Sequence, residues 1–223
     1  MDTEVIFLDY LRLLAPKITD ELVYTSVGNG GAAWHSLKPR EGNLYTTYMG
    51  GTSAMALGLA LALPHRRVIS LDSDGSILMG LTILPVIAHH NTSNLIIIVC
   101  DNERYEAAGS IPTFTAGVTD LVEIARGAGI KDVRLVTKLA EFGGAIDEAF
   151  RVKGTSFLVV KVKGSHPPVA RQNVFCVENK FSFVRHIETT ENLQILRSTL
   201  PKATIPTFGY DKAERRGKGG KRL

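Results

Sequence analysis

The sequence reads Val68-Ile-Ser-Leu-Asp-Ser-Asp-Gly-Ser76 and, one predicted helix later, Asn94-Leu-Ile-Ile-Ile-Val-Cys-Asp-Asn-Glu-Arg-Tyr-Glu106. Each apolar run predicts a strand that is buried on both sides. Asp74, Gly75 and Ser76 follow the first strand and a helix is expected to begin at once, so backbone N–H groups converge where an anionic phosphate fits. Open α/β sheets bind ligands at the carboxyl ends of their strands. The two stretches therefore predict a parallel α/β sheet with a phosphate site at this edge.

Oxygen-bearing side chains at the two strand ends also point to a metal. Mg²⁺ prefers oxygen ligands and is typically held by one or two protein groups together with phosphates. Asp74 and Asn102 are the candidates. Taken singly, Asp-Gly-Ser is better explained as a capped turn and Asp-Asn as another turn. Their joint occurrence, with 25 residues between Gly75 and Asp101, favours a magnesium site.

Short β-rich runs alternate with helical patterns along the chain, which indicates a doubly wound, mostly parallel six-stranded sheet with helices on both faces. Strands are expected at residues 22–27, 43–48, 67–72, 94–100, 133–137 and 156–162. Helices are expected at residues 5–14, 52–63, 76–90, 121–128 and 138–151. Pro85 is expected to kink the third helix.

Length and charge bound the organisation of the chain. The 223 residues suffice for one α/β domain, expected at 1–190, with a C-terminal arm at 191–223. The formal net charge of +4 comes from the last 16 residues, which hold six Lys and Arg against two acidic residues. The neutral body argues against nucleic-acid binding. The basic tail is expected to be disordered, and contact with an acidic partner is the less favoured alternative.

The two cysteines and the lengths of the apolar runs indicate the cellular compartment of the protein. Cys100 and Cys176 fit neither a zinc cluster nor a disulfide framework. The N-terminus carries acidic residues where a signal peptide would be basic, and no apolar run reaches the roughly 18 residues that span a bilayer. We therefore expect a cytoplasmic protein with no membrane association.

The two-part motif resembles the signature of the thiamine diphosphate (ThDP) dependent enzymes, which is Gly-Asp-Gly followed by Asn-Asn. This chain reads Ser73-Asp74-Gly75 and Asp101-Asn102, so it departs at the first position of each element. By resemblance, Asp74, Asn102 and the main-chain oxygen of Arg104 are magnesium ligands, and ThDP and Mg²⁺ are the cofactors.

The resemblance extends to the diphosphate-binding domain of the sulfopyruvate and phosphonopyruvate decarboxylases, over residues 5–187. In that branch a bulky apolar residue 25 positions before the metal aspartate supports the cofactor, and this position is Met49; a core methionine is the alternative. The cofactor-binding set implied in this way is Ser26, Gly28, Asn29, Met49, Gly50, Gly51, Asp74, Gly75, Ser76, Asn102 and Tyr105. A plain turn is the alternative for the loop at residues 25–29. Glu106 is a candidate acid or base near the substrate, and the alternatives are a supporting contact with the residues that bind the cofactor or metal, or a packing role. His35, Lys38 and Arg40 are expected in a solvated polar loop rather than at the substrate.

By resemblance, the catalytic glutamate of this family lies on a second domain that binds the aminopyrimidine. These residues predict only one α/β domain, so a separate α subunit is expected to supply it in a hetero-oligomer. The implied function is that of a β-type subunit of a ThDP-dependent lyase that decarboxylates a small acidic 2-oxo acid. A carboligase subunit of the acetolactate synthase type, or a non-catalytic cofactor-binding or scaffolding subunit, is the alternative. Two cysteines argue against an oxidoreductase subunit with an iron–sulfur cluster.

Overall fold

A parallel sheet forms the centre of the computed structural model, which describes residues 5, 7–45, 48–163 and 176–196. The six strands lie in the order β2-β1-β3-β4-β8-β7, and every neighbouring pair is parallel. They are β1 (Leu22–Thr25), β2 (Asn43–Tyr45), β3 (Val68–Ser73), β4 (Leu95–Asp101), β7 (Asp132–Val136) and β8 (Ser156–Lys161). The predicted doubly wound α/β sheet is confirmed.

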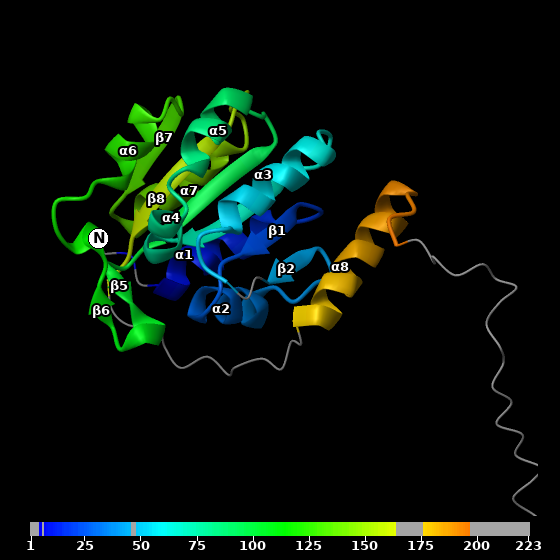
Figure 1. Ribbon diagram of the computed structural model, residues 1–223, viewed down its shortest axis with the longest axis horizontal. Helices are drawn as coiled ribbons and strands as arrows, with labels where there is room; N and C mark the ends of the chain where they lie inside the picture. Colours follow the sequence, from blue (N-terminus) through cyan, green and yellow to red (C-terminus); the bar gives the residue numbers. More distant parts are fainter. Residues whose placement is uncertain (1–4, 6, 46–47, 164–175, 197–223) are drawn as a thin grey trace, which may run out of the picture.

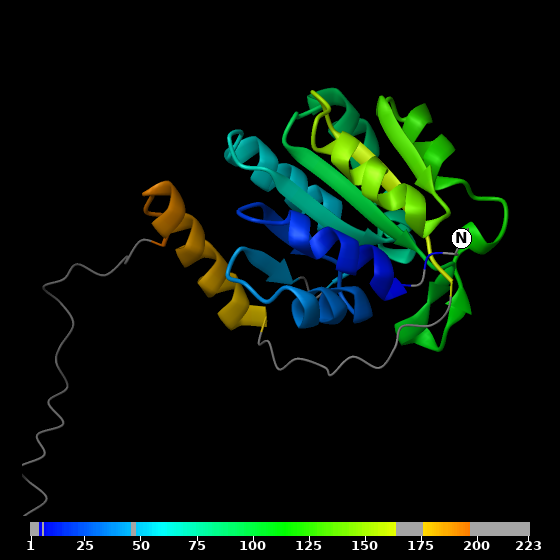
Figure 2. The ribbon, with the colours of Figure 1, turned by 180° about the vertical axis from the view of Figure 1, so that it is seen from behind.

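Helices cover both faces of the sheet (Figures 1 and 2). Side chains of three helices pack in the core on one face: α1 (Phe7–Leu14), α2 (Asn29–Leu37) and α7 (Leu139–Ala149). The core on the other face includes side chains of α3 (Thr52–Ala62), α4 (Asp74–Met79), α5 (Ile83–His90), α6 (Leu121–Gly127) and α8 (Cys176–Glu191). Alternate side chains of β4 enter the two cores, which explains why its apolar run is continuous.

Short elements complete the described chain. They are the 3₁₀ turns η1 (Ala15–Lys17), η2 (Glu106–Ala108) and η3 (Phe114–Ala116), and the two-stranded antiparallel hairpin of β5 (Arg104–Tyr105) and β6 (Ile111–Pro112). The hairpin and the turns η2 and η3 lie between β4 and α6, beyond the carboxyl end of the sheet (Figure 1). The 103–119 stretch therefore lies beside the predicted phosphate site.

The order of the strands reverses between β1 and β3. From β1 the chain moves outward to β2, then returns to β3 on the other side of β1 and continues to β4. The crevice at such a switch point, outside the carboxyl ends of the strands, is where ligands bind in open α/β sheets. The register pairs Ser73 of β3 with Cys100 of β4, so the next residues, Asp74 and Asp101, come to the same level.

The prediction of one helix at 76–90 with a kink at Pro85 is wrong. The chain forms α4 and α5, separated at Gly80 to Thr82. A side chain at Gly80 would have its Cβ 2.2 Å from the backbone oxygen of Gly50, so glycine permits a close approach at the break. Pro85 lies in the first turn of α5, where the N–H that proline lacks would have no helical partner.

Helices α2 and α8 were not predicted. The expectation of a polar loop at His35 is wrong, because α2 includes this residue and buries Ala33 and Trp34. Its Gly30-Gly31 pair disfavours a helix, so tertiary packing overrides the local preference. Gly31 is required for that packing, because a Cβ there would lie 2.9 Å from Oγ1 of Thr25.

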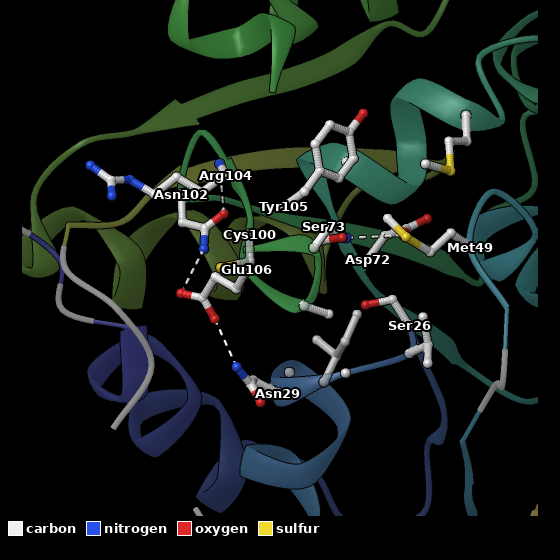
Figure 3. A pocket seen from close by; sticks show the side chains of 18 of the residues that line it. Ser26, Asn29, Met49, Asp72, Ser73, Cys100, Asn102, Arg104, Tyr105 and Glu106 are labelled. Carbon is white, nitrogen blue, oxygen red and sulfur yellow. Dashed lines mark hydrogen bonds between the residues drawn. The ribbon is translucent and has the colours of Figure 1, made fainter. Parts of the chain in front are cut away.

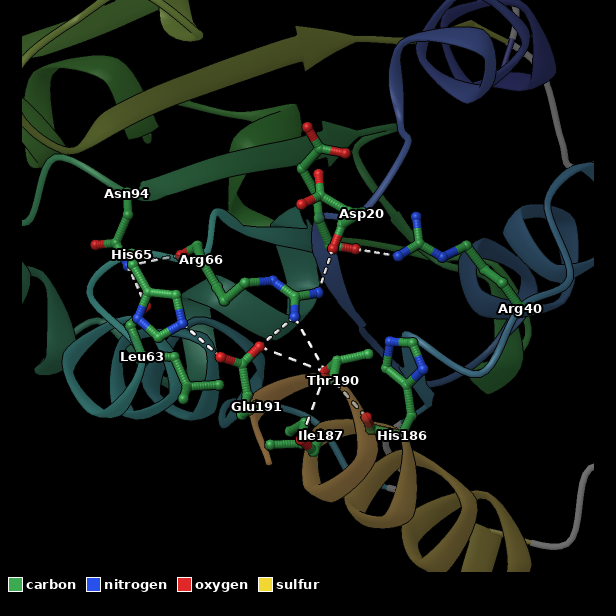
Figure 4. Close-up of polar contacts among 11 residues, drawn as sticks. Asp20, Arg40, Leu63, His65, Arg66, Asn94, His186, Ile187, Thr190 and Glu191 are labelled. Atoms are coloured by element: carbon green, nitrogen blue, oxygen red, sulfur yellow. Dashed lines mark hydrogen bonds and ion pairs between the residues drawn. The ribbon is translucent and has the colours of Figure 1, made fainter. Parts of the chain in front are cut away.

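Helix α8 lies along the edge strand β2 (Figure 1). Asn179 accepts a hydrogen bond from the N–H of Tyr45 and donates one to the carbonyl of Asn43, both at 2.9 Å, as a neighbouring strand would. At the end of α8, Glu191 contacts His65 and Arg66 of the α3–β3 turn (Figure 4). The domain boundary at 190 stays a prediction, and most of the predicted arm at 191–223 lies outside the described residues.

No helix in the described ranges is both long and apolar enough to cross a membrane.

Candidate functional site

A cavity of about 430 Å³ opens at the carboxyl edge of the sheet (Figure 3). Its walls come from α1, from the segments after β1, β3 and β4, and from the segment before α3. The predicted residues that line it are Ser26, Gly28, Asn29, Met49, Gly75, Asn102, Arg104, Tyr105 and Glu106. Four other predicted residues, Gly50, Gly51, Asp74 and Ser76, do not line it. The fold thus gathers most of the predicted site from segments far apart in the sequence.

Ser73 caps the helix that begins the site. Its side chain accepts a hydrogen bond from the N–H of Ser76 at 3.3 Å, and α4 starts at Asp74, two residues before the predicted start at Ser76. Serine is among the preferred residues at this capping position. The departure from glycine at position 73 therefore has a local structural reason.

Asp74 is buried, with 1% of its surface exposed, and only one of its oxygens is hydrogen-bonded within the described chain. Oδ2 accepts hydrogen bonds from Oγ1 of Thr113 at 2.6 Å and from Oγ1 of Thr115 at 3.2 Å. Oδ1 is buried and has no hydrogen-bond partner among the described residues. Burial, with a smaller contribution from the nearby Asp101 carboxylate, raises the pKa of Asp74 to about 6, although the hydrogen bond from the Thr113 hydroxyl opposes the shift.

A buried carboxylate oxygen with no donor is costly unless a cation compensates its charge. Asp74 therefore fits a divalent metal that takes oxygen ligands, which is the chemistry of Mg²⁺. This arrangement is the physical observation that supports a metal at the predicted position.

Lys161 contacts Asp101, the residue that stands where the motif has its first asparagine. Its Nζ lies 2.9 Å from Oδ2 of Asp101, while Thr115 donates to Oδ1 of Asp101 at 2.8 Å. The ammonium group on β8 also donates to Oε1 of Glu103 at 2.6 Å, so it is shared between two carboxylates and offsets part of the charge that aspartate adds where the motif has asparagine. Thr113, Thr115 and Lys161 were missed by the sequence analysis, because nothing in their local sequence says that they contact the motif.

Glu106 connects two of the predicted cofactor residues (Figure 3). Nδ2 of Asn102 donates to Oε1 of Glu106 at 3.1 Å, and Nδ2 of Asn29 donates to Oε2 at 2.8 Å. Oδ1 of Asn102 accepts a hydrogen bond from the N–H of Arg104 at 3.3 Å. One carboxylate therefore joins the β1–α2 segment to the segment after β4.

Glycines allow the remaining predicted residues to approach one another. A Cβ on Gly75 would lie 2.5 Å from Cε1 of Tyr105 and 3.2 Å from Cε of Met49, so both side chains contact this position closely. Gly50 has a φ of +83° and its N–H donates to Oγ of Ser76 at 3.1 Å. Gly50 and Ser76 thus stabilise the wall behind the cavity rather than line it.

Asp72, Cys100 and Tyr10 also line the cavity and were not predicted. Burial raises the pKa of the Asp72 carboxyl, and hydrogen bonds from Ser53 and from the N–H of Ser73 oppose the shift. Burial also raises the pKa of the Cys100 thiol and of the Tyr10 hydroxyl well above their usual values. A thiol of this kind is protonated at neutral pH and is a poor nucleophile.

The polar residues near β2 lie away from the cavity. His35, Lys38 and Arg40 are absent from its lining, and Lys38 and Arg40 precede β2 at the amino end of the sheet. Nδ1 of His35 is 3.0 Å from the Tyr45 hydroxyl. These side chains are not placed to contact a ligand in the cavity.

A family model described as "Thiamine pyrophosphate enzyme, C-terminal TPP binding domain" matches residues 26–160. The sulfopyruvate decarboxylase subunit beta of Methanothermobacter thermautotrophicus is 35% identical over 163 residues, covering 73% of this chain and 84% of the relative. The same subunit of Methanocaldococcus jannaschii is 30% identical over 183 residues, covering 81% and 96%. The phosphonopyruvate decarboxylase of Streptomyces viridochromogenes is 30% identical, and the match spans only 41% of its length.

Solved structures show the same fold. The thiamine diphosphate-dependent 4-hydroxybenzoylformate decarboxylase of Rhodococcus jostii RHA1 superposes with a TM-score of 0.63 at 22% identity, over 75% of this chain and 34% of that chain. The matched residues include the cavity segments from Ser26 to Ile111, with Asp74 and Asn102 among them. The chain belongs to the thiamine pyrophosphate enzymes and carries their C-terminal TPP-binding domain.

Proposed function

We propose that this chain is the β-type subunit of a ThDP- and Mg²⁺-dependent decarboxylase that acts on a small acidic 2-oxo acid. The active site would be shared with a separate α subunit that binds the aminopyrimidine. The single observation that carries the proposal is the buried Asp74 carboxylate, whose Oδ1 has no partner in the described chain, beside a cavity lined by Asn102. The proposal keeps the cytoplasm as the location, because the chain has only two cysteines.

In this proposal Asp74, Asn102 and the main-chain oxygen of Arg104 hold Mg²⁺. The hydroxyl groups of Thr113 and Thr115 fix Oδ2 of Asp74, so that Oδ1 is the oxygen available to a cation. Ser26, Gly28, Asn29, Gly75 and Ser76 belong to the segments that would hold the diphosphate.

ThDP, when bound, supplies the electron sink for the loss of carbon dioxide from a 2-oxo acid. The chain's own part is to bind and to exclude water. Met49, Leu71 and Met79 give the cavity an apolar wall, and the rings of Tyr10 and Tyr105 extend it. A water-poor wall strengthens the electrostatic contacts made inside the site.

The names of the relatives support a split enzyme and an acidic substrate. Two relatives named as beta subunits are matched over 96% and 84% of their lengths, so this chain corresponds to a subunit of that size. By analogy with those names, sulfopyruvate and phosphonopyruvate are the first substrates to test.

The test uses the chain co-expressed with the candidate α subunit. We expect Mg²⁺-dependent ThDP binding by calorimetry and release of carbon dioxide from one of the two acids. Asp74→Ala should abolish both, whereas Asp20→Ala, an exposed aspartate at the amino edge of the sheet, should leave both unchanged. Full activity of the Asp74→Ala complex would mean that this chain is a non-catalytic subunit. Product analysis separates decarboxylation from carboligation, because a carboligase would consume the acid and release a longer condensed product.

A further inference from the structure

The Glu106 carboxylate lies between two segments that are far apart in the sequence. Asn29 is the first residue of α2 and Asn102 follows β4, and their Nδ2 atoms donate to different oxygens of the same carboxylate at 2.8 and 3.1 Å (Figure 3). We infer that Glu106 is a positioning residue, which orients the amides of Asn29 and Asn102 so that Oδ1 of Asn102 is presented to a cation. The inference rests on the proposed function and assigns Glu106 a role in that site.

Because the Glu106 carboxylate can only accept hydrogen bonds, it determines how the side-chain amides of Asn29 and Asn102 are oriented. An ionised carboxylate only accepts hydrogen bonds, whereas an amide has an NH₂ donor on one side and an oxygen acceptor on the other. Each asparagine must therefore turn Nδ2 toward Glu106. For Asn102, Oδ1 then lies on the opposite side of the amide, where it accepts from the N–H of Arg104 and keeps a second lone pair for a metal.

The backbone around Glu106 supports this role. Glu106 begins η2 and directly follows Tyr105, whose ring contacts the position of Gly75. Ser110 donates a backbone hydrogen bond to the carbonyl of Tyr105 at 3.0 Å, which closes the turn that contains Glu106. The carboxylate is thus carried by a hydrogen-bonded turn rather than by an extended loop.

Glu106→Gln is the informative substitution because glutamine has the same shape as glutamate but replaces one acceptor oxygen with an NH₂ donor. The new amide would have one acceptor oxygen and one NH₂ group, so it could accept from only one of the two asparagines. Its NH₂ would face the NH₂ of the other asparagine, and one amide would have to turn around. If Asn102 turns, it presents a donor where the cation needs an oxygen.

Two other roles for Glu106 predict different results. A catalytic acid or base would lose turnover in Glu106→Gln while the cofactor and metal affinities stay unchanged. If the Glu106 carboxylate merely occupies the place of the incoming diphosphate, Glu106→Gln would bind ThDP more tightly, because a competing anion is removed. A positioning role predicts weaker metal binding.

The experiment measures Mg²⁺ affinity by calorimetry in the complete α–β complex with saturating ThDP, together with turnover. We expect Glu106→Gln to weaken Mg²⁺ binding by roughly tenfold, in the range for residues that orient metal ligands, and Glu106→Asp to recover part of the loss. The matched control is Glu123→Gln, which removes the same charge from an exposed pair with Arg126 on α6. Unchanged thermal unfolding of the cofactor-free Glu106→Gln chain shows that the fold is intact.

Equal or tighter Mg²⁺ binding by Glu106→Gln would overturn the positioning role. A wild-type complex that binds neither ThDP nor Mg²⁺ would overturn the proposed function itself, so the two failures are distinguishable.

Discussion

Asp74, the proposed metal ligand, carries a cost to the stability of the cofactor-free chain. Its pKa is raised from 3.8 to about 6, first by burial. A carboxyl whose pKa is higher in the folded than in the unfolded state contributes stability below its unfolded pKa and loses that contribution as the pH rises through the folded pKa. Above pH 6 the folded chain therefore contains a buried charge that burial penalises.

Asp74→Asn should therefore stabilise the cofactor-free chain at pH 7.5 and change its stability much less at pH 4. The difference between the two pH values should be on the order of 3 kcal/mol, because each pKa unit corresponds to about 1.4 kcal/mol. Urea unfolding of both proteins at the two pH values measures it. A stability difference between the wild type and Asp74→Asn that is the same at pH 4 and pH 7.5 would contradict the burial of an ionised Asp74. In the complex with the α subunit, added ThDP and Mg²⁺ should stabilise only the wild type.

The sequence predicted the residues of the site that belong to its two motif elements. Asp74 and Asn102 could be found because each directly follows a recognisable strand, and the fold places both strand ends at one edge. The hydroxyls of Thr113 and Thr115 and the ammonium of Lys161 could not be found, because their contacts with Asp74 and Asp101 depend on how a loop and another strand pack.

The sequence analysis predicted one helix where the structure has α4 and α5, and the break between them tests how tightly the cavity wall is packed. Gly80→Ala would place a Cβ 2.2 Å from the backbone oxygen of Gly50. Since Gly50 also donates to Ser76, the substitution should displace the wall next to Met49. We expect a lower unfolding midpoint and weaker ThDP binding.

Gly58→Ala in α3 is the matched control. A Cβ at Gly58 meets nothing within 4 Å, so alanine should stabilise that helix, by up to about 1 kcal/mol. Thermal unfolding and ThDP titration of the two variants make the comparison. Equal midpoints for the two variants would show that the approach of Gly80 to Gly50 is not a packing constraint.

Elements with strong local signals were predicted, and elements formed by packing were not. The buried strands β3, β4 and β8 have continuous apolar runs and lie within the sheet as predicted. Helix α2 contains a glycine pair, and the polar helix α8 is partly held by side-chain hydrogen bonds to the edge of β2. Hydrophobic periodicity could not predict either helix, because the residues that stabilise each one are distant in the sequence.

Exposed apolar side chains lie at both ends of the molecule. Phe114 is 73% exposed in the segment next to the cavity and Met79, which lines it, is 60% exposed. Phe181 is 42% exposed on α8, beside the opposite edge strand β2 (Figure 1). If a partner subunit completes the site, it must cover the edge where the cavity opens.

Hydroxyl-radical footprinting read by mass spectrometry tests this arrangement in solution. Formation of the complex with the α subunit and ThDP should protect Phe114 and Met79 severalfold from oxidation, while Phe181 provides a matched phenylalanine on the far side and should keep its reactivity. The physical reason is that a shared cavity is closed only if the partner excludes water from its mouth. Protection of Phe181 with continued oxidation of Phe114 and Met79 would place the partner on α8 and contradict a shared active site at the carboxyl edge of the sheet.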